Sequence, residues 1–356
     1  EDNSAMDGYA VRSGDVVTPA TTLPVSQRIA AGQVGVPLEP GSAARIFTGA
    51  QIPPGADAVV MQERCVAGDG FVRFDVVPGH GESIRRRGED LRRGGVVLEA
   101  GMRLTPQALG QAASAGAASV QVARRPRVAL FSTGDELAMP GQALTPGAIY
   151  NSNRFTLRGL IETQGGLCDD LGIVVDRLDA TREVLRRAAA GNDLIVSCGG
   201  VSVGEEDHLK PAVELEGRLD LWQIAIKPGK PLAFGEVRRG DGSSAWFVGL
   251  PGNPVSAFVT FLFAVRPLLL KLQGATTLTP RPLPMRADFA WPRADARREF
   301  LRVRRNDSGG LDLFAQQGSG VLTSTVWADG LVDNPPSTPI ARGDTVRYLP
   351  FSELLG

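Results

Sequence analysis

The middle of the chain alternates short apolar runs with longer amphipathic segments. The runs have the length of buried strands, and the segments between them repeat apolar residues at helical spacing. Strands that are apolar throughout and are separated by helices form parallel sheets that are covered on both faces. We therefore predict a doubly wound α/β domain over 125–274. Its predicted strands are 128–131, 171–175, 194–197, 221–226 and 245–248, and its predicted helices are 153–163, 181–190, 207–215 and 254–272.

Both flanking regions consist of short β-like pieces between Gly and Pro turns. Such pieces predict a small, mostly β domain over 20–81 and a second one over 275–356. Residues 1–19 and 82–124 make up the remaining part, a mixed domain in which Thr105 and Pro106 predict the start of a helix that continues to residue 118. The β-like pieces are 25–30, 43–47, 58–62 and 71–76 in the first domain and 298–304, 311–314 and 345–349 in the second.

The composition argues against several classes of protein. Hydrophobic residues make up 43% of the chain, and 38 Lys and Arg residues stand against 39 Asp and Glu residues, for a net charge of −1. This balance provides no general attraction for nucleic acid or for an anionic membrane. The longest apolar stretch, 258–270, is interrupted by Arg266 and Pro267 and is too short to span a bilayer. We expect neither a nucleic acid partner nor a membrane partner, and any anion-binding site must be local.

Cysteine and histidine usage points to a reducing compartment. Three cysteines without a CxxC pair and two histidines argue against a disulfide framework and against a His-based metal site, so a cytoplasmic location is expected. The first ten residues lack the basic region and apolar core of a signal peptide. Because no Met precedes Glu1, we expect earlier residues to be missing, which leaves the mixed domain incomplete.

Four Gly-rich loops directly follow predicted strands, at 132–136, 197–204, 227–231 and 249–256. Ligands of α/β sheets bind beyond the carboxyl ends of the strands, so these loops are expected to form one pocket. Glycines let backbone N–H groups approach an anion, and lysines and serines add charge and hydrogen-bond donors. A single loop of this kind is more often a plain turn, but four together predict a site for a phosphate-bearing small molecule. The polar side chains concerned are Ser197, Ser202, Ser256, Lys227 and Lys230.

Acidic residues flank the same loops. Acids beside phosphate-binding lysines suit Mg²⁺, which takes a few carboxylates together with water and phosphate oxygens. Helix capping is the alternative; it is favoured for Glu205 and Glu206 and is evenly balanced for Asp207. Nearby, Cys198 has no histidine close in sequence to activate it and is predicted to be a small buried residue. The acids are Asp135, Glu136, Glu205, Glu206 and Asp207.

Seven motifs, in one order along nearly the whole chain, resemble the MoeA/gephyrin E-domain family of molybdenum insertases. They are DNSAMDGYA at 2–10, RIFTGA at 45–50, RRGED at 86–90, STGDEL at 132–137, GGVSVG at 199–204, KPGKP at 227–231 and GLPGNPVS at 249–256. The resemblance implies a central MogA-like α/β domain with two small β domains and a partial mixed domain.

The resemblance also implies an activity. Members insert molybdate into adenylylated molybdopterin, hydrolyse its pyrophosphate link with Mg²⁺ and release AMP. It further implies an elongated homodimer with a shared active site, in which the first motif and the Thr48 region face the α/β domain of the partner. Molybdopterin adenylyltransferase is implied as a possible upstream partner.

Residue roles follow from the same match. The positions implied as catalytic are Asp207, Glu136, Asp90, Asp7 and Thr48, and the implied metal-binding acids are Asp207, Glu136 and Asp176. The positions implied to bind the cofactor and the oxyanion are Ser132, Thr133, Gly134, Gly199, Gly200, Ser202, Gly204, Lys227, Lys230, Pro231, Pro251, Gly252, Asn253, Ser256, Arg297 and Ser319.

Two other functions stay open at this point. Molybdopterin adenylyltransferase would carry a GGTG loop and would lack the β domains, whereas this chain has GGVSVG and both domains. A non-catalytic scaffold of the gephyrin type would be expected to lose the acids or the lysines, which are present here. The chain departs from the pattern of bacterial members at Cys198 and at residues 206–208, which leaves the detail of the pocket open.

Overall fold

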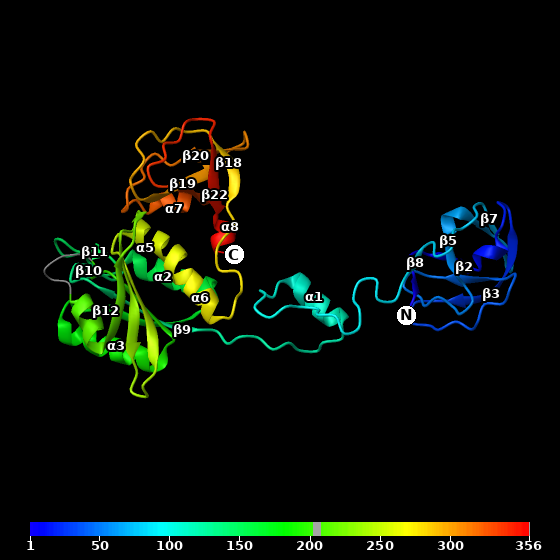
Figure 1. Ribbon diagram of the computed structural model, residues 1–356, viewed down its shortest axis with the longest axis horizontal. Coiled ribbons are helices and arrows are strands. Elements are labelled where there is room, and N and C mark those ends of the chain that lie inside the picture. The colour runs from blue at the N-terminus through cyan, green and yellow to red at the C-terminus, as the bar shows by residue number, and fades with distance from the viewer. Residues whose placement is uncertain (202–207, 356) are drawn as a thin grey trace. The chain divides into compact units, whose positions relative to one another are not determined.

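The computed structural model describes residues 1–201 and 208–355, and the chain folds into two compact units. The first unit contains Glu1–Leu98 and Pro106–Ala118, and the second contains Glu99–Thr105 and Ser119–Gly356. Figure 1 shows the β-rich first unit in blue and the α/β sheet with the C-terminal β domain in green to red.

The first unit is built on a six-stranded sheet in the order β5-β2-β4-β3-β7-β6. Both faces of the sheet are buried: Tyr9 and Val11 of β2 belong to one apolar cluster, and Ala10 belongs to another. Because β2, which lies between β5 and β4, comes from the segment 1–19, the sheet contains residues from both sides of the expected boundary at residue 19. The strands are β1 (Asn3–Ser4), β2 (Gly8–Val11), β3 (Thr22–Ile29), β4 (Ala43–Ile46), β5 (Ala58–Met61), β6 (Cys65–Ala67), β7 (Phe71–Phe74) and β8 (Ile84–Arg85), with short 3-10 turns at Ser13–Asp15 and Gln62–Arg64.

Helix α1 (Pro106–Ser114) begins with the proline predicted for its first position. It ends earlier than predicted because Gly116 adopts a left-handed backbone conformation (φ +86°). The N–H of Ala117 then bonds back to the carbonyl of Ala112 at 3.1 Å, which closes the helix as glycine-terminated helices commonly do.

The second unit contains a six-stranded sheet in the order β12-β9-β13-β17-β16-β14, whose first four strands are parallel. Its strands are β9 (Arg127–Thr133), β12 (Leu167–Val174), β13 (Leu194–Cys198), β14 (Gly217–Gln223), β16 (Pro231–Arg238) and β17 (Ser244–Leu250), and its helices are α2 (Ser152–Thr163), α3 (Leu178–Gly191), α4 (Leu209–Glu216), α5 (Pro254–Thr260) and α6 (Arg266–Leu272). The short strands β10 (Leu137–Ala138) and β11 (Ile149–Tyr150) pair in parallel beside it.

Alternate residues of the strands face opposite layers of helices. Val128 and Leu130 of β9 pack in the cluster that contains α2, α5 and α6, whereas Ala129 and Phe131 pack in the cluster that contains α3 and α4. The doubly wound prediction is therefore confirmed, and it follows from strands that are apolar on both faces.

The sheet is not wholly parallel. Strand β16, which the sequence pattern did not reveal, runs antiparallel between β17 and β14. Its insertion leaves β14 running in the direction of the parallel strands, so the chain leaves β14 at the same edge as it leaves β13 and β17. The predicted strand 221–226 divides there: β14 ends at Gln223, and Ile226–Lys227 form β15, which pairs with β19 (Arg298–Arg305) of the C-terminal domain.

The predicted helix 254–272 continues through Pro267. A π-helical turn at Phe261–Val265 precedes α6, and Pro267 lies in the first turn of α6, where a missing N–H costs little. By length and composition this 19-residue helix could cross a membrane, contrary to the expectation from the interrupted apolar stretch. However, 61% of its apolar window is buried inside the protein, as in the core helix of a soluble fold.

The C-terminal domain is a closed barrel. Its strands are hydrogen-bonded in the order β19-β20-β18-β22-β21, and β21 pairs again with β19. Phe300 of β19 stacks on Phe263 of the long helix with ring centroids 4.0 Å apart, so the barrel and the α/β domain share apolar contacts. The remaining elements are β18 (Leu283–Ala287), β20 (Gly310–Leu313), β21 (Gly330–Asn334), β22 (Thr345–Pro350), α7 (Thr323–Trp327) and α8 (Phe351–Leu355).

Candidate functional site

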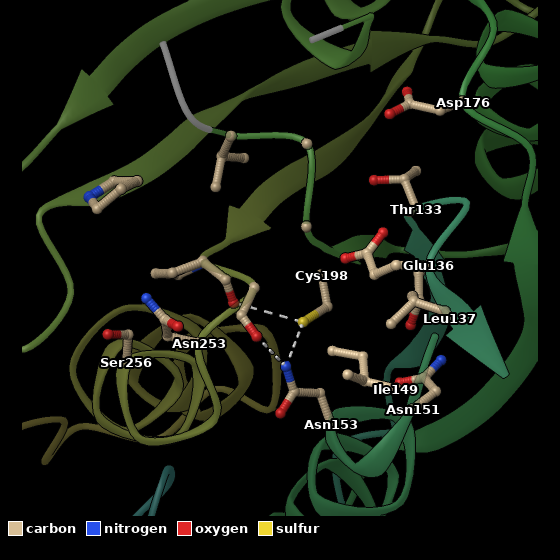
Figure 2. Close-up of a pocket in the computed structure, with 18 residues that line it drawn as sticks. Thr133, Glu136, Leu137, Ile149, Asn151, Asn153, Asp176, Cys198, Asn253 and Ser256 are labelled. Carbon is tan, nitrogen blue, oxygen red and sulfur yellow. Dashed lines mark hydrogen bonds between the residues drawn. The ribbon is translucent and has the colours of Figure 1, made fainter. Parts of the chain in front are cut away.

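A cavity of about 420 Å³ lies at the carboxyl ends of β9, β13 and β17, where the Gly-rich loops were expected to meet (Figure 2). Residues from all four loops line it. Twelve predicted site residues are among its walls: Ser132, Thr133, Gly134, Glu136, Asp176, Gly199, Gly200, Pro231, Pro251, Gly252, Asn253 and Ser256.

Gly199 allows two of these loops to meet. Its φ is +92°, and a Cβ at this position would lie 2.5 Å from the carbonyl oxygen of Thr133. No other residue type fits there without moving the backbone. The turn after β13 therefore packs directly on the end of β9, and both contribute to the cavity wall.

Three buried polar groups on the cavity wall make no hydrogen bond with the described part of the chain. They are Ser132 Oγ, Thr133 Oγ1 and the side-chain nitrogen of Asn151. A buried donor or acceptor without a partner costs free energy, so such groups suit a polar ligand that completes their bonding.

Asn153 links the end of β13 with the turn after β17, and both form part of the cavity wall. Its side-chain nitrogen donates to the carbonyl of Gly252 at 2.7 Å and to Cys198 Sγ at 3.2 Å, and Figure 2 shows these bonds as dashed lines. Cys198 is buried as predicted, and burial raises the pKa of its thiol to about 12. The thiol is therefore protonated at neutral pH and is not an activated nucleophile.

Two carboxylates, Glu136 and Asp176, reach the cavity from the β9 and β12 sides. Among residues 1–201 and 208–355, no three His, Cys, Asp or Glu side chains gather closely enough to hold a metal ion by themselves. Mg²⁺ commonly binds through one or two carboxylates, with waters and substrate phosphates completing its shell. Glu136 and Asp176 therefore fit a Mg²⁺ that arrives with a phosphorylated substrate.

The predicted cations lie outside the cavity lining. Lys227 Nζ is 3.2 Å from Asp295 Oδ2 and 3.2 Å from Glu299 Oε1, and Arg297 makes a two-pronged ion pair with Asp295. Lys230 is exposed on the same loop. The loop nevertheless borders the site, because Pro231 lines the cavity.

The Gly318–Ser319 turn of the barrel also approaches the cavity wall. The Ser319 carbonyl accepts the N–H of Val255 at 2.9 Å, next to Ser256. Arg302, which is buried, donates to the carbonyls of Gly318 and Phe300, and burial lowers its pKa to about 10. A buried arginine thus holds the turn in place through carbonyl oxygens.

Three of the predicted catalytic residues, Asp7, Thr48 and Asp90, belong to the first unit. The backbone N–H and the hydroxyl of Thr48 both donate to Asp7 Oδ1, at 2.7 and 2.8 Å. These bonds, the backbone one foremost, hold the pKa of Asp7 below its ordinary value. The predicted pair thus lies together, whereas Asp90 is exposed in a bend. Ser202, Gly204 and Asp207 lie outside the described residues.

Family comparisons agree with this architecture along the chain. Residues 1–116 match the MoeA N-terminal region (domain I and II), residues 129–271 match a probable molybdopterin binding domain, and residues 284–351 match the MoeA C-terminal region (domain IV). The chain is 41% identical to a Haemophilus influenzae protein named molybdopterin molybdenumtransferase, over all of this chain and 88% of that protein. The chain belongs to the MoeA family.

More distant members agree. Molybdopterin molybdenumtransferase 2 of Mycobacterium tuberculosis is 36% identical over 94% of this chain and 84% of that protein. The crystal structure of the molybdopterin biosynthesis MoeA protein from Pyrococcus horikoshii matches with a TM-score of 0.84 at 27% identity, covering 98% of this chain and 87% of that chain. The similarity to other MoeA proteins therefore extends over all the domains.

Sequence reasoning missed several cavity residues of this MoeA family member. Leu137 and Ile149 belong to β10 and β11, and Asn151 and Asn153 lie at the start of α2. None of them directly follows a predicted strand of the main sheet, which was the signal used. The sequence NSN at 151–153 could have indicated the start of a helix, because asparagine is a preferred N-cap residue. Asn151 is the N-cap of α2 in the structure.

Proposed function

We propose that this chain is a molybdopterin molybdenumtransferase, which inserts molybdenum into molybdopterin during cofactor biosynthesis. The supporting observation is the cavity of about 420 Å³, lined by buried hydroxyl and amide groups, in the region that matches a molybdopterin-binding domain. Relatives that carry this name favour insertion over adenylylation and over a purely structural role.

We further propose that the substrate is adenylylated molybdopterin and that its pyrophosphate link is hydrolysed with release of AMP. When bound, Mg²⁺ would supply positive charge to the phosphate oxygens. Glu136 and Asp176 would hold it, and Ser132 and Thr133 would donate hydrogen bonds to polar groups of the substrate. The MoeA family likeness supports this assignment, and Asp207 is included as a third acid through its motif.

The activity is tested by mixing the protein with adenylylated molybdopterin, Mg²⁺ and molybdate and following AMP. We expect AMP release that depends on Mg²⁺ and a product that activates a molybdenum-free molybdoenzyme. Folded protein that releases no AMP and forms no active cofactor would overturn the proposal. A Glu136→Gln variant should retain its fold and lose most of the activity, whereas Glu162→Gln, on the exposed face of α2, should match the wild type.

We also propose a cytoplasmic homodimer that shares its active sites, with Asp7 and Thr48 of one copy closing the cavity of the other. Molybdopterin adenylyltransferase is proposed as the supplier of the substrate. An Asp7→Asn variant and a Glu136→Gln variant, each inactive, can be mixed after reversible dissociation. Half of the dimers are then mixed and carry one intact site of two, so about a quarter of wild-type activity should return. No recovery in verified mixed dimers would place both residues in one chain's site.

A further inference from the structure

Two cations from different parts of the fold converge on one carboxylate. Lys227 lies in β15, and Arg297 lies in the loop before β19, yet both contact Asp295. Arg297 donates from Nε to Oδ1 at 2.9 Å and from Nη2 to Oδ2 at 3.0 Å, and Lys227 Nζ approaches the same Oδ2 at 3.2 Å. All three side chains remain partly exposed, at 40% for Lys227, 34% for Arg297 and 23% for Asp295, so a small ion from solvent can reach them.

Glu299 holds Lys227 independently of Asp295. Its side chain is 1% exposed, and its Oε1 lies 3.2 Å from Lys227 Nζ. Its other oxygen accepts from Trp291 Nε1 at 2.8 Å and from the Asp295 backbone N–H at 3.1 Å. The ion pair between Lys227 and Glu299 does not depend on Asp295, so Lys227 can exchange Asp295 for another anion while it stays beside Glu299.

The Asp295 backbone is anchored as well. Besides its N–H bond to Glu299, its carbonyl accepts the N–H of Ser337 at 2.8 Å. The Arg297 backbone N–H also donates to Asp295 Oδ1 at 3.0 Å, so release of the two cations requires rotation of the Asp295 side chain and loss of this bond, without movement of the loop.

The same loop borders the proposed substrate cavity. Strand pairing of β15 with β19 sets Lys227 opposite Glu299, and Gly229 packs against Thr260 and Ser256 of α5. Pro231, which ends the loop, and Ser256 both line the cavity. The ammonium of Lys230 makes no ion pair within the described ranges and can add a third positive charge.

We propose that Asp295 is an internal counter-ion that a tetrahedral oxyanion, molybdate in the proposed reaction, displaces from Lys227 and Arg297. The proposal rests on the proposed function for the identity of the anion. A carboxylate held by a guanidinium and an ammonium has the charge and the hydrogen-bonding pattern of one edge of an oxyanion. Asp295 stays ionised throughout, since its bonds to Arg297 foremost hold its pKa far below the ordinary value.

This arrangement has an energetic consequence. Without substrate, the two cations are neutralised and fixed by Asp295, and binding of the oxyanion must first break those contacts. Part of the attraction between the oxyanion and the site is offset by the ion pairs that are lost. Asp295 is thus a residue that weakens and tunes oxyanion affinity, and its removal should tighten binding.

Equilibrium dialysis of molybdate against the whole protein tests this inference, with bound molybdenum measured by mass spectrometry. Asp295→Asn and Asp295→Ala should each lower the Kd for molybdate, by roughly 5-fold. Asp295→Glu, which keeps the carboxylate, should stay near the wild type. Lys227→Ala and Arg297→Ala should raise the Kd.

Asp288→Asn is the matched control. Asp288 makes the same two-pronged bond to an arginine two positions away, with Arg286 Nε at 2.8 Å and Nη2 at 3.0 Å, but it does not touch Lys227. This variant should leave the Kd unchanged.

A weaker or unchanged affinity in both neutral Asp295 variants would overturn the inference and leave Asp295 a structural ion pair. Absence of molybdate binding in the wild type and the variants would overturn it as well. AMP release by the wild type is measured separately. A failure of the proposed enzymatic function is therefore distinguished from a failure of the proposal that Asp295 is a counter-ion.

Discussion

The side chain of Asn153 donates a hydrogen bond to the carbonyl of Gly252, although 99 positions separate the two residues in sequence. The same nitrogen contacts the buried Cys198. One amide thereby links the start of α2 with the end of β13 and with the turn that follows β17, and all three surround the cavity.

Replacement of Asn153 by alanine should loosen this arrangement. The Gly252 carbonyl would lose its partner, and because Gly252 is exposed and water can replace the bond, the loss should cost about 0.5–1.5 kcal/mol. We expect a lower melting temperature and a higher KM for the pterin substrate, measured by differential scanning fluorimetry and by AMP release. Asn153→Asp keeps the shape but removes the donor and should behave similarly. Wild-type values for both would show that the amide does not order the site.

Removal of the unpartnered hydroxyls should lower substrate affinity without lowering the stability of the protein. Because Ser132 Oγ and Thr133 Oγ1 have no hydrogen-bond partner in the described structure, Ser132→Ala and Thr133→Val should leave the melting temperature unchanged or raise it slightly. Substrate affinity should fall by about 5-fold or more, because the ligand loses its donors. Calorimetric titration with the pterin substrate measures the affinity.

Ser197 provides the matched control for these variants. Its hydroxyl is equally buried and lacks a partner among the described residues, but it does not line the cavity. Ser197→Ala should leave both stability and affinity close to the wild type. An equal loss of affinity in all three variants would indicate a general effect of the substitutions.

The bonds between Thr48 and Asp7 predict a lowered pKa of Asp7, which a titration can measure. Thr48→Val removes the hydroxyl donor but keeps the backbone N–H, so the pKa of Asp7 should rise part of the way toward its ordinary value of 3.8. Carbon-detected NMR with labelled aspartate measures the change. Thr48→Ser keeps the hydroxyl and should retain the low pKa; equal values in the two variants would contradict the assignment.

Glu216 should make stability depend on pH. Arg186 foremost and Arg182 bond its carboxylate and lower its pKa from 4.5 to about 2. Its contribution is thus fully present above pH 4.5 and is lost as the pH falls toward 2. Because both arginines are partly exposed, we expect Glu216→Gln to cost only about 1 kcal/mol at pH 7.

Melting curves at several pH values check this prediction. At pH 7 the Glu216→Gln variant should melt roughly 2–4 °C lower than the wild type. The difference should shrink between pH 4.5 and pH 2. A difference that is constant over this range would exclude the ionised carboxylate as its source.

The α/β domain could be predicted from sequence because each of its predicted strands and helices shows the pattern in its own residues. Strands such as Arg127–Thr133 are apolar on both faces, which identifies a sheet covered by helices. Strand β16 escaped detection because it begins at a proline and carries Gly235 and Glu236, which weaken the strand pattern. Its place in the sheet is set by pairing with β17 and β14 and not by its own residues.

The site was predictable only where it depends on strand ends. The rule that ligands bind beyond the carboxyl ends identified Ser132, Gly199 and Gly252. It could not reveal that Lys227 is already paired with Asp295 and Glu299, because those acids come from a barrel strand and loop far along the chain. Charge is visible in a sequence, whereas the partner of a charge depends on the tertiary fold.

The loop between β15 and β16 has a mechanical consequence. Ile226–Lys227 are hydrogen-bonded into the barrel sheet and Pro231–Arg238 into the α/β sheet, so three residues join two separate sheets. Fully extended, the backbone from Lys227 to Pro231 spans at most about 14 Å. This short connection keeps the two domains close together here, so any relative rotation of the two domains must pivot about this loop.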